Sequence, residues 1–363
     1  MDYQKQPIVI MAGGTGGHVF PALAVANDLR GRGEQIVWMG TRSGIESRLV
    51  PEAGFPIEWL SVQGIRGNGL MVKALAPFKL LNTCLQAFKV LRKHQPRAVL
   101  GMGGFVSGPG GLMAWLLRIP LIIHEQNAIS GLTNKLLSHL ARINYFAFPQ
   151  AAKNVRNSVV VGNPVRPEIV NIPAPEIRLA QHGSDSLNVL VLGGSLGALT
   201  LNKVVPEALA MIELSQRPNV RHQSGTRHIE ACRAEYASHD LKAEVVEFID
   251  DMNAAYQWAD LVVCRAGALT VAELSAAGVA SILIPYPYAV DDHQYANAQF
   301  LEQAGAAKII REQALTAEGL KQLLIEFSTS RAQLLEMSCK ARAVAYTDAA
   351  QQVANGILQE AKQ

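Results

Sequence analysis

Short apolar runs alternate with longer amphipathic stretches along the whole chain. In the first half the runs predict strands at residues 7–11, 35–40, 57–62, 98–102, 121–124 and 144–148. The pattern then restarts and predicts strands at residues 188–194, 219–223, 244–248, 261–264, 280–284 and 307–311. Strand-length runs that alternate with helix-length stretches are typical of βαβ units with parallel strands. The pattern predicts the α/β class, with one parallel sheet in each half.

A proline cluster and a polar segment separate the halves, and this composition is typical of a linker. The cluster consists of Pro164, Pro167, Pro173 and Pro175, and QHGSDS follows it. We therefore expect two Rossmann-like domains, at residues 1–163 and 164–340. We expect them to face a deep interdomain cleft, because ligands bind at the carboxyl ends of parallel strands. Residues 341–363 have a helical pattern, and we expect them to pack back on the first domain.

Three glycine-rich turns follow predicted strands, at residues 13–17, 101–105 and 193–197. Glycine allows positive φ and a close approach of the backbone to a ligand, and a following helix N-terminus attracts phosphate. The first turn is no dinucleotide fingerprint, because Val19 stands at the place of the third glycine, and no P-loop, because no lysine follows. The alternative is tight strand–helix packing, but three such turns favour phosphate binding.

Charge is distributed unevenly over the 363 residues, although the net charge is only +3. Residues 1–167 hold 18 Lys and Arg against 7 Asp and Glu, whereas residues 168–363 hold 15 against 23. A half-chain with so few acids attracts a membrane surface, a nucleic acid or a phosphorylated substrate, unless its basic face is merely solvated.

The sequence predicts neither a metal site nor a cofactor. It contains no D-x-D pair of the kind that holds a divalent cation beside a nucleotide diphosphate. His124 and Glu125 do not begin an H-E-x-x-H zinc motif, because Ala128 takes the place of the second histidine. The four cysteines are widely spaced, and we expect them to be reduced in a cytoplasmic protein without a secretory signal.

Eight segments resemble the MurG family of N-acetylglucosaminyltransferases, in order along nearly the whole chain. They are GGTGGHVFPALAVA, GMGGFVSGPGG, HEQNAISGLTNK, VGNPVR, GGSLGA, FIDDM, CRAGALTVAEL and HQYANA. The resemblance implies a GT-B fold and inverting, β-1,4-forming transfer of GlcNAc from UDP-GlcNAc to lipid I, undecaprenyl-diphospho-MurNAc-pentapeptide. It implies no nucleic-acid partner, and a place on the cytoplasmic face of the bacterial inner membrane, with other cell-wall synthesis proteins as possible partners.

The resemblance also implies a donor site. Glu273 matches the carboxylate that binds the ribose hydroxyls, and Ile249 the residue whose backbone reads uracil. Ser195 matches a hydroxyl on the diphosphate, and Gln294 a glutamine on the sugar. The remaining implied donor contacts are Thr15, Gly16, Gly17, Asn127, Arg166, Ala268, Leu269, Thr270, Val271 and Ala272. The chain departs from the family pattern at Phe105, Leu196 and His293, and by one apparent insertion in PYPYAVDD.

The first glycine turn suggests a base for the reaction. His18 lies at a predicted helix start, where the positive dipole end keeps an imidazole neutral and able to accept a proton. Alternatively it caps the helix or contacts the acceptor phosphate. Glu125 is the second candidate base, although pairing with an arginine would explain it as well. The acceptor diphosphate is expected at Gly13, Gly14, Gly103 and Gly104. For Glu273, the alternative is a first-turn acid that stabilises its helix.

Residues 70–93 contain no acid and place Phe78, Leu81, Leu85 and Phe88 on one helical face. An apolar stripe flanked by basic residues suits a helix that lies on an anionic membrane surface. The alternative is a sheet-covering helix whose stripe is core. The predicted membrane patch comprises Lys73, Leu75, Phe78, Lys79, Leu81, Leu85, Trp115 and Arg118.

Three other functions remain open from the sequence. A UDP-GlcNAc 2-epimerase would share the fold and the donor-side glutamate, but has no use for an apolar, basic surface. An NAD-dependent oxidoreductase would fit two Rossmann-like halves, but the fingerprints are broken. A non-catalytic nucleotide-sugar-binding subunit would need only one of the two halves.

Overall fold

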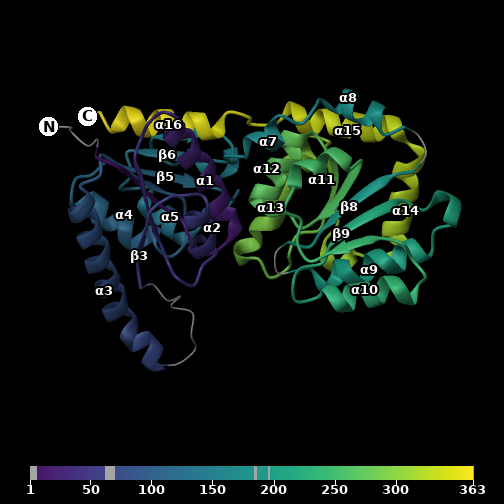
Figure 1. Ribbon diagram of the computed structural model, residues 1–363, viewed down its shortest axis with the longest axis horizontal. Coiled ribbons are helices and arrows are strands. Elements are labelled where there is room, and N and C mark those ends of the chain that lie inside the picture. The colour runs from purple at the N-terminus through teal and green to yellow at the C-terminus, as the bar shows by residue number, and fades with distance from the viewer. Residues whose placement is uncertain (1–5, 62–69, 184–185, 195–196, 363) are drawn as a thin grey trace. The chain divides into compact units, whose positions relative to one another are not determined.

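The structure is a computed structural model that describes residues 6–61, 70–183, 186–194 and 197–362. For residues 70–76 it describes the backbone only. The chain forms two compact units (Figure 1). Unit 1 comprises Met1–Arg166 and Thr347–Gln363, and unit 2 comprises Pro167–Tyr346. Each of the twelve predicted strands is present, with ends within three residues of the prediction.

Unit 1 contains a seven-stranded parallel sheet in the order β3-β2-β1-β4-β5-β6-β7. The strands are β1 (Ile8–Met11), β2 (Ile36–Gly40), β3 (Ile57–Trp59), β4 (Ala98–Gly101), β5 (Leu121–Glu125), β6 (Ile143–Phe146) and β7 (Ser158–Val160). Strand β7, which has three residues and none of them buried, was not predicted.

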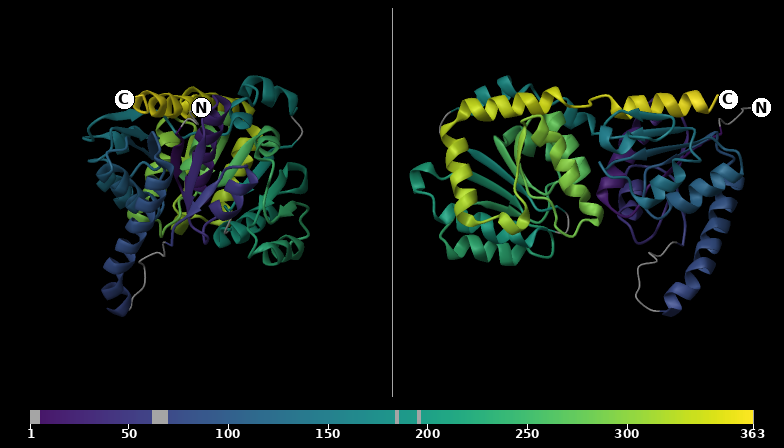
Figure 2. Two further views of the ribbon diagram at one scale, coloured as in Figure 1. Left: turned by 60° about the vertical axis from the view of Figure 1, so that its left-hand side comes forward. Right: turned by 180° about the vertical axis from the view of Figure 1, so that it is seen from behind.

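Helices cover both faces of this sheet because successive side chains of a strand point to opposite sides. Ile8 and Ile10 pack against α1 (Gly16–Gly31) and α16 (Ala349–Glu360). Val9 and Met11 face the other core, which is covered by α3 (Leu70–His94), α4 (Ser107–Leu116) and α5 (Leu132–Leu137). Two shorter helices are α2 (Glu46–Glu52) and α6 (Pro149–Ala152). Figure 2 shows α16, in yellow, along the top of unit 1.

Unit 2 contains a six-stranded parallel sheet in the order β10-β9-β8-β11-β12-β13. The strands are β8 (Asn188–Leu192), β9 (Asn219–Gln223), β10 (Glu244–Val246), β11 (Leu261–Cys264), β12 (Ala280–Leu283) and β13 (Ala307–Ile309). One face carries α9 (Leu199–Ala210), α10 (Ile229–Ser238) and α14 (Ala317–Thr329). The other carries α11 (Met252–Trp258), α12 (Ala268–Ala277) and α13 (His293–Gln303).

The proline cluster is not an unstructured linker. Pro167 begins the short helix α7 (Pro167–Val170), and Pro175 begins α8 (Pro175–Gln181). Proline suits the first turn of a helix, because its missing N–H would have no intrahelical partner there. A composition that is typical of a linker is therefore equally compatible with two helix starts.

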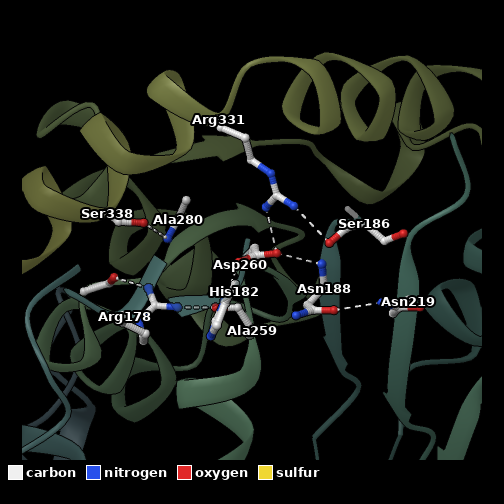
Figure 3. A network of polar contacts seen from close by, with 11 residues as sticks. Arg178, His182, Ser186, Asn188, Asn219, Ala259, Asp260, Ala280, Arg331 and Ser338 are labelled. Carbon is white, nitrogen blue, oxygen red and sulfur yellow. Dashed lines mark hydrogen bonds and ion pairs between the residues drawn. The ribbon is translucent and has the colours of Figure 1, made fainter. Parts of the chain in front are cut away.

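A buried carboxylate holds the amino edge of the unit 2 sheet (Figure 3). Asp260 accepts hydrogen bonds from the Asn188 N–H at 2.8 Å and from Nη1 of Arg331 at 2.8 Å, and its Oδ1 lies 2.6 Å from Nδ1 of His182. Arg331 begins α15 (Arg331–Ala343) and His182 follows α8. The network ties these two helices to the sheet.

Arg178 on α8 lies near this network. Burial lowers the pKa of Arg178 to about 10, although the negative charge of Asp260 opposes the shift.

Candidate active site

The strand order reverses at one strand in each sheet. In unit 1, β1 lies between β2 and β4, so the turns after β1 and β4 are neighbours at the carboxyl edge. In unit 2, β8 lies between β9 and β11, so the third glycine turn neighbours the start of α12. Ligands of open α/β sheets bind at such switch points. The three glycine turns therefore lie where the fold favours a ligand.

The first two glycine turns touch each other. A Cβ on Gly104 would collide with the backbone of Gly13, and a Cβ on Gly103 would lie 2.8 Å from Cδ2 of His18. Gly103 and Gly104 also have φ angles of 94° and 80°, which side-chain-bearing residues rarely adopt. Glycine is needed at both positions, for conformation and for space. The fold thus brings together Gly13, Gly14, Gly103 and Gly104, the four glycines predicted to hold the acceptor diphosphate.

His18 is half-buried in the first turn of α1, beside Gly103. Thr15 is the N-cap residue of this helix, and its Oγ1 lies 3.4 Å from Nδ1 of His18. Gly16 and Gly17 lie between them, where helix N–H groups lack intrahelical partners. The ring of His18 therefore lies beside the N–H groups and the positive end of this helix.

A buried glutamate that the sequence did not reveal lies behind the first glycine turn. Glu46 is fully buried and accepts hydrogen bonds from the N–H of Gly14 at 2.9 Å and the N–H of Thr41 at 2.9 Å. The Thr41 hydroxyl also donates to it, at 2.7 Å. One carboxylate thereby joins the turns after β1 and β2.

Glu125, the second candidate base, is buried at the end of β5 and holds the loop that follows. Its carboxylate accepts from the N–H of Asn127 at 2.9 Å, the N–H of Gly131 at 3.1 Å and Nδ2 of Asn134 at 2.9 Å. Burial raises the pKa of Glu125, although these hydrogen bonds oppose the rise. The described contacts are to amides rather than to the arginine that the sequence suggested, and they fix the position of Asn127.

The preceding residue, His124, is a neutral part of the scaffold. Its Nε2 lies 2.9 Å from the carbonyl oxygen of Gly162, and Nε2 of Gln126 lies 3.2 Å from its Nδ1. Burial lowers the pKa of His124 to about 4, so the ring stays neutral at physiological pH. With one nitrogen donating and the other accepting, the ring links β5 to the segment that follows β7.

Arg166 belongs to unit 1 and directly precedes α7, the first helix of unit 2. Its guanidinium lies over the ring of Phe20 on α1, 5.4 Å from the ring centre. The predicted nucleotide-contacting arginine therefore packs against the same helix that carries His18.

In unit 2, Glu273 is buried in the second turn of α12, which begins at Ala268. The hydroxyl of Tyr256 donates to its Oε2 at 3.1 Å. The alternative interpretation, a first-turn acid, is wrong, because the first turn consists of uncharged residues. Tyr256 was not predicted, and it keeps the carboxylate oriented. The predicted contacts Ala268, Leu269, Thr270, Val271 and Ala272 form the helix start in front of Glu273.

The third glycine turn is packed against the end of β9. The N–H of Gly193 donates to the carbonyl of Gln223 at 3.1 Å, and a Cβ on Gly197 would collide with the carbonyl of Ser224. Gly194 and Gly197 both have a φ of 79°. Ser195 and Leu196 lie outside the described residues. The backbone of this turn thus requires glycine at its two described ends.

Ile249 and Gln294 both take part in hydrogen bonds within unit 2. The N–H of Ile249 lies 3.4 Å from Oε1 of Gln223, at the limit of a hydrogen bond. Oε1 of Gln294 accepts from the N–H of Tyr286 at 2.9 Å. The side-chain oxygen of Gln294 is therefore held by the loop that contains the apparent insertion. The amide nitrogen of the same side chain takes no part in this hydrogen bond.

Helix α3 has two apolar faces. Its inner face buries Ala87 and Leu91 in the core of unit 1, whereas the predicted outer stripe is solvent-exposed. Phe78 is 71% exposed and Leu81 59%. The described exposed apolar residues continue onto the neighbouring helices α4 and α5 as Trp115, Leu116, Leu132 and Leu136, of which only Trp115 was predicted.

Basic residues accompany this outer face. Lys79, Lys89 and Arg92 are exposed on α3, and Arg118 follows α4. The side chains of Lys73 and Leu75 lie outside the described residues. No described helix is long and apolar enough to span the bilayer. Within the described part of the chain, no cluster of His, Cys, Asp and Glu has the arrangement of a metal site.

Two family descriptions cover most of the chain. "Glycosyltransferase family 28 N-terminal domain" matches residues 8–145, and "Glycosyltransferase family 28 C-terminal domain" matches residues 188–353. Together with two parallel-sheet units, they define a glycosyltransferase of the GT-B class. The chain belongs to glycosyltransferase family 28 and, within it, to the MurG family that the motifs resembled.

Individual relatives agree with this assignment. A protein of Nitrosomonas europaea is 54% identical over 352 residues, 97% of this chain and 98% of its own length. One from Dechloromonas aromatica is 50% identical over 96% of this chain and 97% of its own. Both are named UDP-N-acetylglucosamine--N-acetylmuramyl-(pentapeptide) pyrophosphoryl-undecaprenol N-acetylglucosamine transferase. The crystal structure of Acinetobacter baumannii MurG matches with a TM-score of 0.84 and 43% identity, over 98% of this chain and 99% of that one.

Proposed function

We propose that this protein transfers GlcNAc from UDP-GlcNAc to the 4-hydroxyl of MurNAc in undecaprenyl-diphospho-MurNAc-pentapeptide. The observation that carries the proposal is the identity of 50–54% with transferases of this name over nearly their whole length. The transfer breaks the bond between the anomeric carbon and UDP and forms a β-1,4 bond with inversion.

In this proposal His18 accepts the proton of the attacking hydroxyl. Its place at the start of α1 supports the role, since the helix dipole favours the neutral ring. The adjoining glycine turns, with Gly13, Gly14, Gly103 and Gly104, receive the acceptor diphosphate. The N–H groups of a helix start supply oriented dipoles for that negative charge without reorganisation.

The donor binds to unit 2 in this proposal. Glu273 accepts hydrogen bonds from the vicinal ribose hydroxyls, and its burial against Tyr256 supports this role because the carboxylate is held in place. The start of α12 and the third glycine turn, including Ser195, face the diphosphate. Ile249 reads uracil, Gln294 and Asn127 hold the sugar, and Arg166, Thr15, Gly16 and Gly17 complete the contacts.

The outer faces of α3, α4 and α5 lie on the anionic cytoplasmic leaflet of the membrane. Large apolar side chains that stay exposed next to lysine and arginine support this, because such a surface gains from both lipid tails and anionic headgroups. The lipid-linked acceptor thus becomes accessible to a protein whose described helices do not cross the bilayer.

A transfer assay tests the proposal. Purified protein is incubated with UDP-GlcNAc and a lipid I analogue, and UDP release is measured with and without the analogue. We expect UDP release only when the analogue is present, with one disaccharide product per UDP, and we expect it to continue in EDTA. Epimerised sugar formed without the analogue would instead indicate an epimerase. A UDP-N-acetylglucosamine 2-epimerase structure shares the fold at a TM-score of 0.67, but at 14% identity it does not support that activity here.

A further inference from the structure

We propose that Glu46 is a positioning residue that sets the first glycine turn for the acceptor diphosphate. The inference rests on the proposed function and adds a residue that contacts no substrate. It starts from the observation that a fully buried carboxylate takes the N–H of Gly14, in a turn that is expected to bind phosphate.

Three glycines make room for this carboxylate. A Cβ on Gly13 would lie 2.5 Å from Oε1 of Glu46, a Cβ on Gly40 would lie 2.8 Å from its Cγ, and a Cβ on Gly44 would collide with Oε2. Any larger residue at these positions would push the side chain away from the turn. The surroundings of Glu46 are thus specific for a long side chain that reaches the Gly14 N–H.

The hydrogen bonds of Glu46 decide which amides of the turn remain for a ligand. Gly14 has a φ of 92°, and its N–H points to Oε2 of Glu46 at 2.9 Å. A phosphate that approached this N–H would meet the negative carboxylate. Glu46 therefore occupies the Gly14 amide and leaves the acceptor diphosphate to the other amides of the two adjoining glycine turns, next to His18.

The contact continues to the second glycine turn. Gly13, which touches Glu46, is also the residue whose backbone meets Gly104, and Gly103 in turn lies against His18. A displacement of Glu46 would shift the first turn relative to both. The expected consequence is weaker acceptor binding, whereas the donor contacts in unit 2 are unaffected.

The decisive variant is Glu46→Gln. Its amide matches the carboxylate in size, but its NH₂ group must face either the Gly14 N–H or the Thr41 N–H, which are both donors. We expect the KM for a lipid I analogue to rise at least about tenfold, a loss of about 1.4 kcal/mol in acceptor binding, because the first turn no longer holds its position. The KM for UDP-GlcNAc should rise less than the acceptor KM, because the donor contacts in unit 2 are unaffected. An unchanged acceptor KM would overturn the inference.

A second variant reaches Glu46 from the other side. Gly44→Ala places a methyl group against Oε2 and should reproduce the rise in acceptor KM, even if Glu46→Gln folds poorly. Gly31→Ala is the matched control, because a Cβ there meets no atom within 4 Å. If Gly44→Ala behaves like Gly31→Ala, the inference is wrong. Failure of the proposed function is distinguishable, because the wild-type protein itself would then not transfer GlcNAc to the analogue.

Discussion

The carboxyl edges of the two sheets are built alike but are held by different chemistry. In unit 1 two buried carboxylates accept backbone N–H groups: Glu46 joins the turns after β1 and β2, and Glu125 holds the loop after β5. In unit 2 the corresponding support is neutral. Nε2 of His222 lies 3.0 Å from Oδ1 of Asn202, and Nδ2 of Asn202 donates to the carbonyl of Ser224 at 3.1 Å. The single buried carboxylate at that edge, among the residues described here, is Glu273.

The difference indicates how each edge meets negative charge. A carboxylate that is saturated by amides fixes a loop but also repels an anion from that side, so in unit 1 it restricts where a diphosphate fits. A neutral scaffold leaves the edge of unit 2 without such repulsion, in keeping with the proposal that the donor diphosphate binds there and that Glu273 accepts from hydroxyl groups. Substitutions of Glu46 in unit 1 and of Glu273 in unit 2 should therefore differ in which substrate they affect most.

The largest effect is expected at His18. His18→Ala should lower kcat by about 10²- to 10⁴-fold, which is the usual contribution of a general base. UDP affinity should hardly change, because the donor contacts of unit 2 remain. Steady-state transfer and calorimetric UDP binding measure the two quantities, with His139→Ala, an exposed histidine of the same unit, as the control. A loss of less than about tenfold in kcat would contradict the role of His18 as base.

Glu273→Gln should act on the donor alone. We expect the KM for UDP-GlcNAc to rise by about 10- to 100-fold, as for the loss of hydrogen bonds to a charged group, with the acceptor KM unchanged. Glu230→Gln is the control, because Glu230 is an exposed acid in the first turn of α10. Should both variants behave alike, or should the acceptor KM rise instead, the separation between the two edges would fail.

Acid should destabilise both units through one buried histidine each. Burial lowers the pKa of His124 to about 4 and that of His222 to about 3, below the unfolded value near 6.5. Between these values the unfolded chain binds a proton that the folded chain does not, so stability present above pH 6.5 is lost as the pH falls.

From pH 7 to pH 5 the loss should be about 2 kcal/mol for each histidine. Urea unfolding at the two pH values measures it. His124→Gln and His222→Gln should each remove about half of the pH-dependent difference, whatever their effect at pH 7. Equal pH dependence in the wild type and in both variants would show that neither histidine is the cause.

The smallest expected effect concerns the outer face of α3. The double variant Phe78→Asp and Leu81→Asp should weaken binding to phosphatidylglycerol vesicles at least about tenfold, because two apolar side chains no longer enter the lipid. Leu214→Asp is the control, since Leu214 is 81% exposed in unit 2. Vesicle co-sedimentation at low salt measures the binding. Equal losses in both proteins would contradict a membrane surface confined to unit 1.

Much of the local structure at the candidate site could be predicted because it depends on local sequence. A glycine turn between a strand and a helix needs only adjacent residues, so His18, the glycine turns and the start of α12 follow from spacing and from the resemblance. Glu46, Tyr256 and Gln223 could not be predicted in the same way. Each acts on a residue 17 to 32 positions away in the chain, and only the sheet brings these residues together.

The sequence by itself determined the two parallel sheets, the positions of their strands and the excess of positive charge in the first half, because periodicity and composition are local properties. Tertiary structure decided which buried acids serve as scaffold, which side of α3 is core and which side is exposed, and that prolines begin helices α7 and α8. These features depend on which groups lose contact with water. Burial is a property of the packed units rather than of any segment alone.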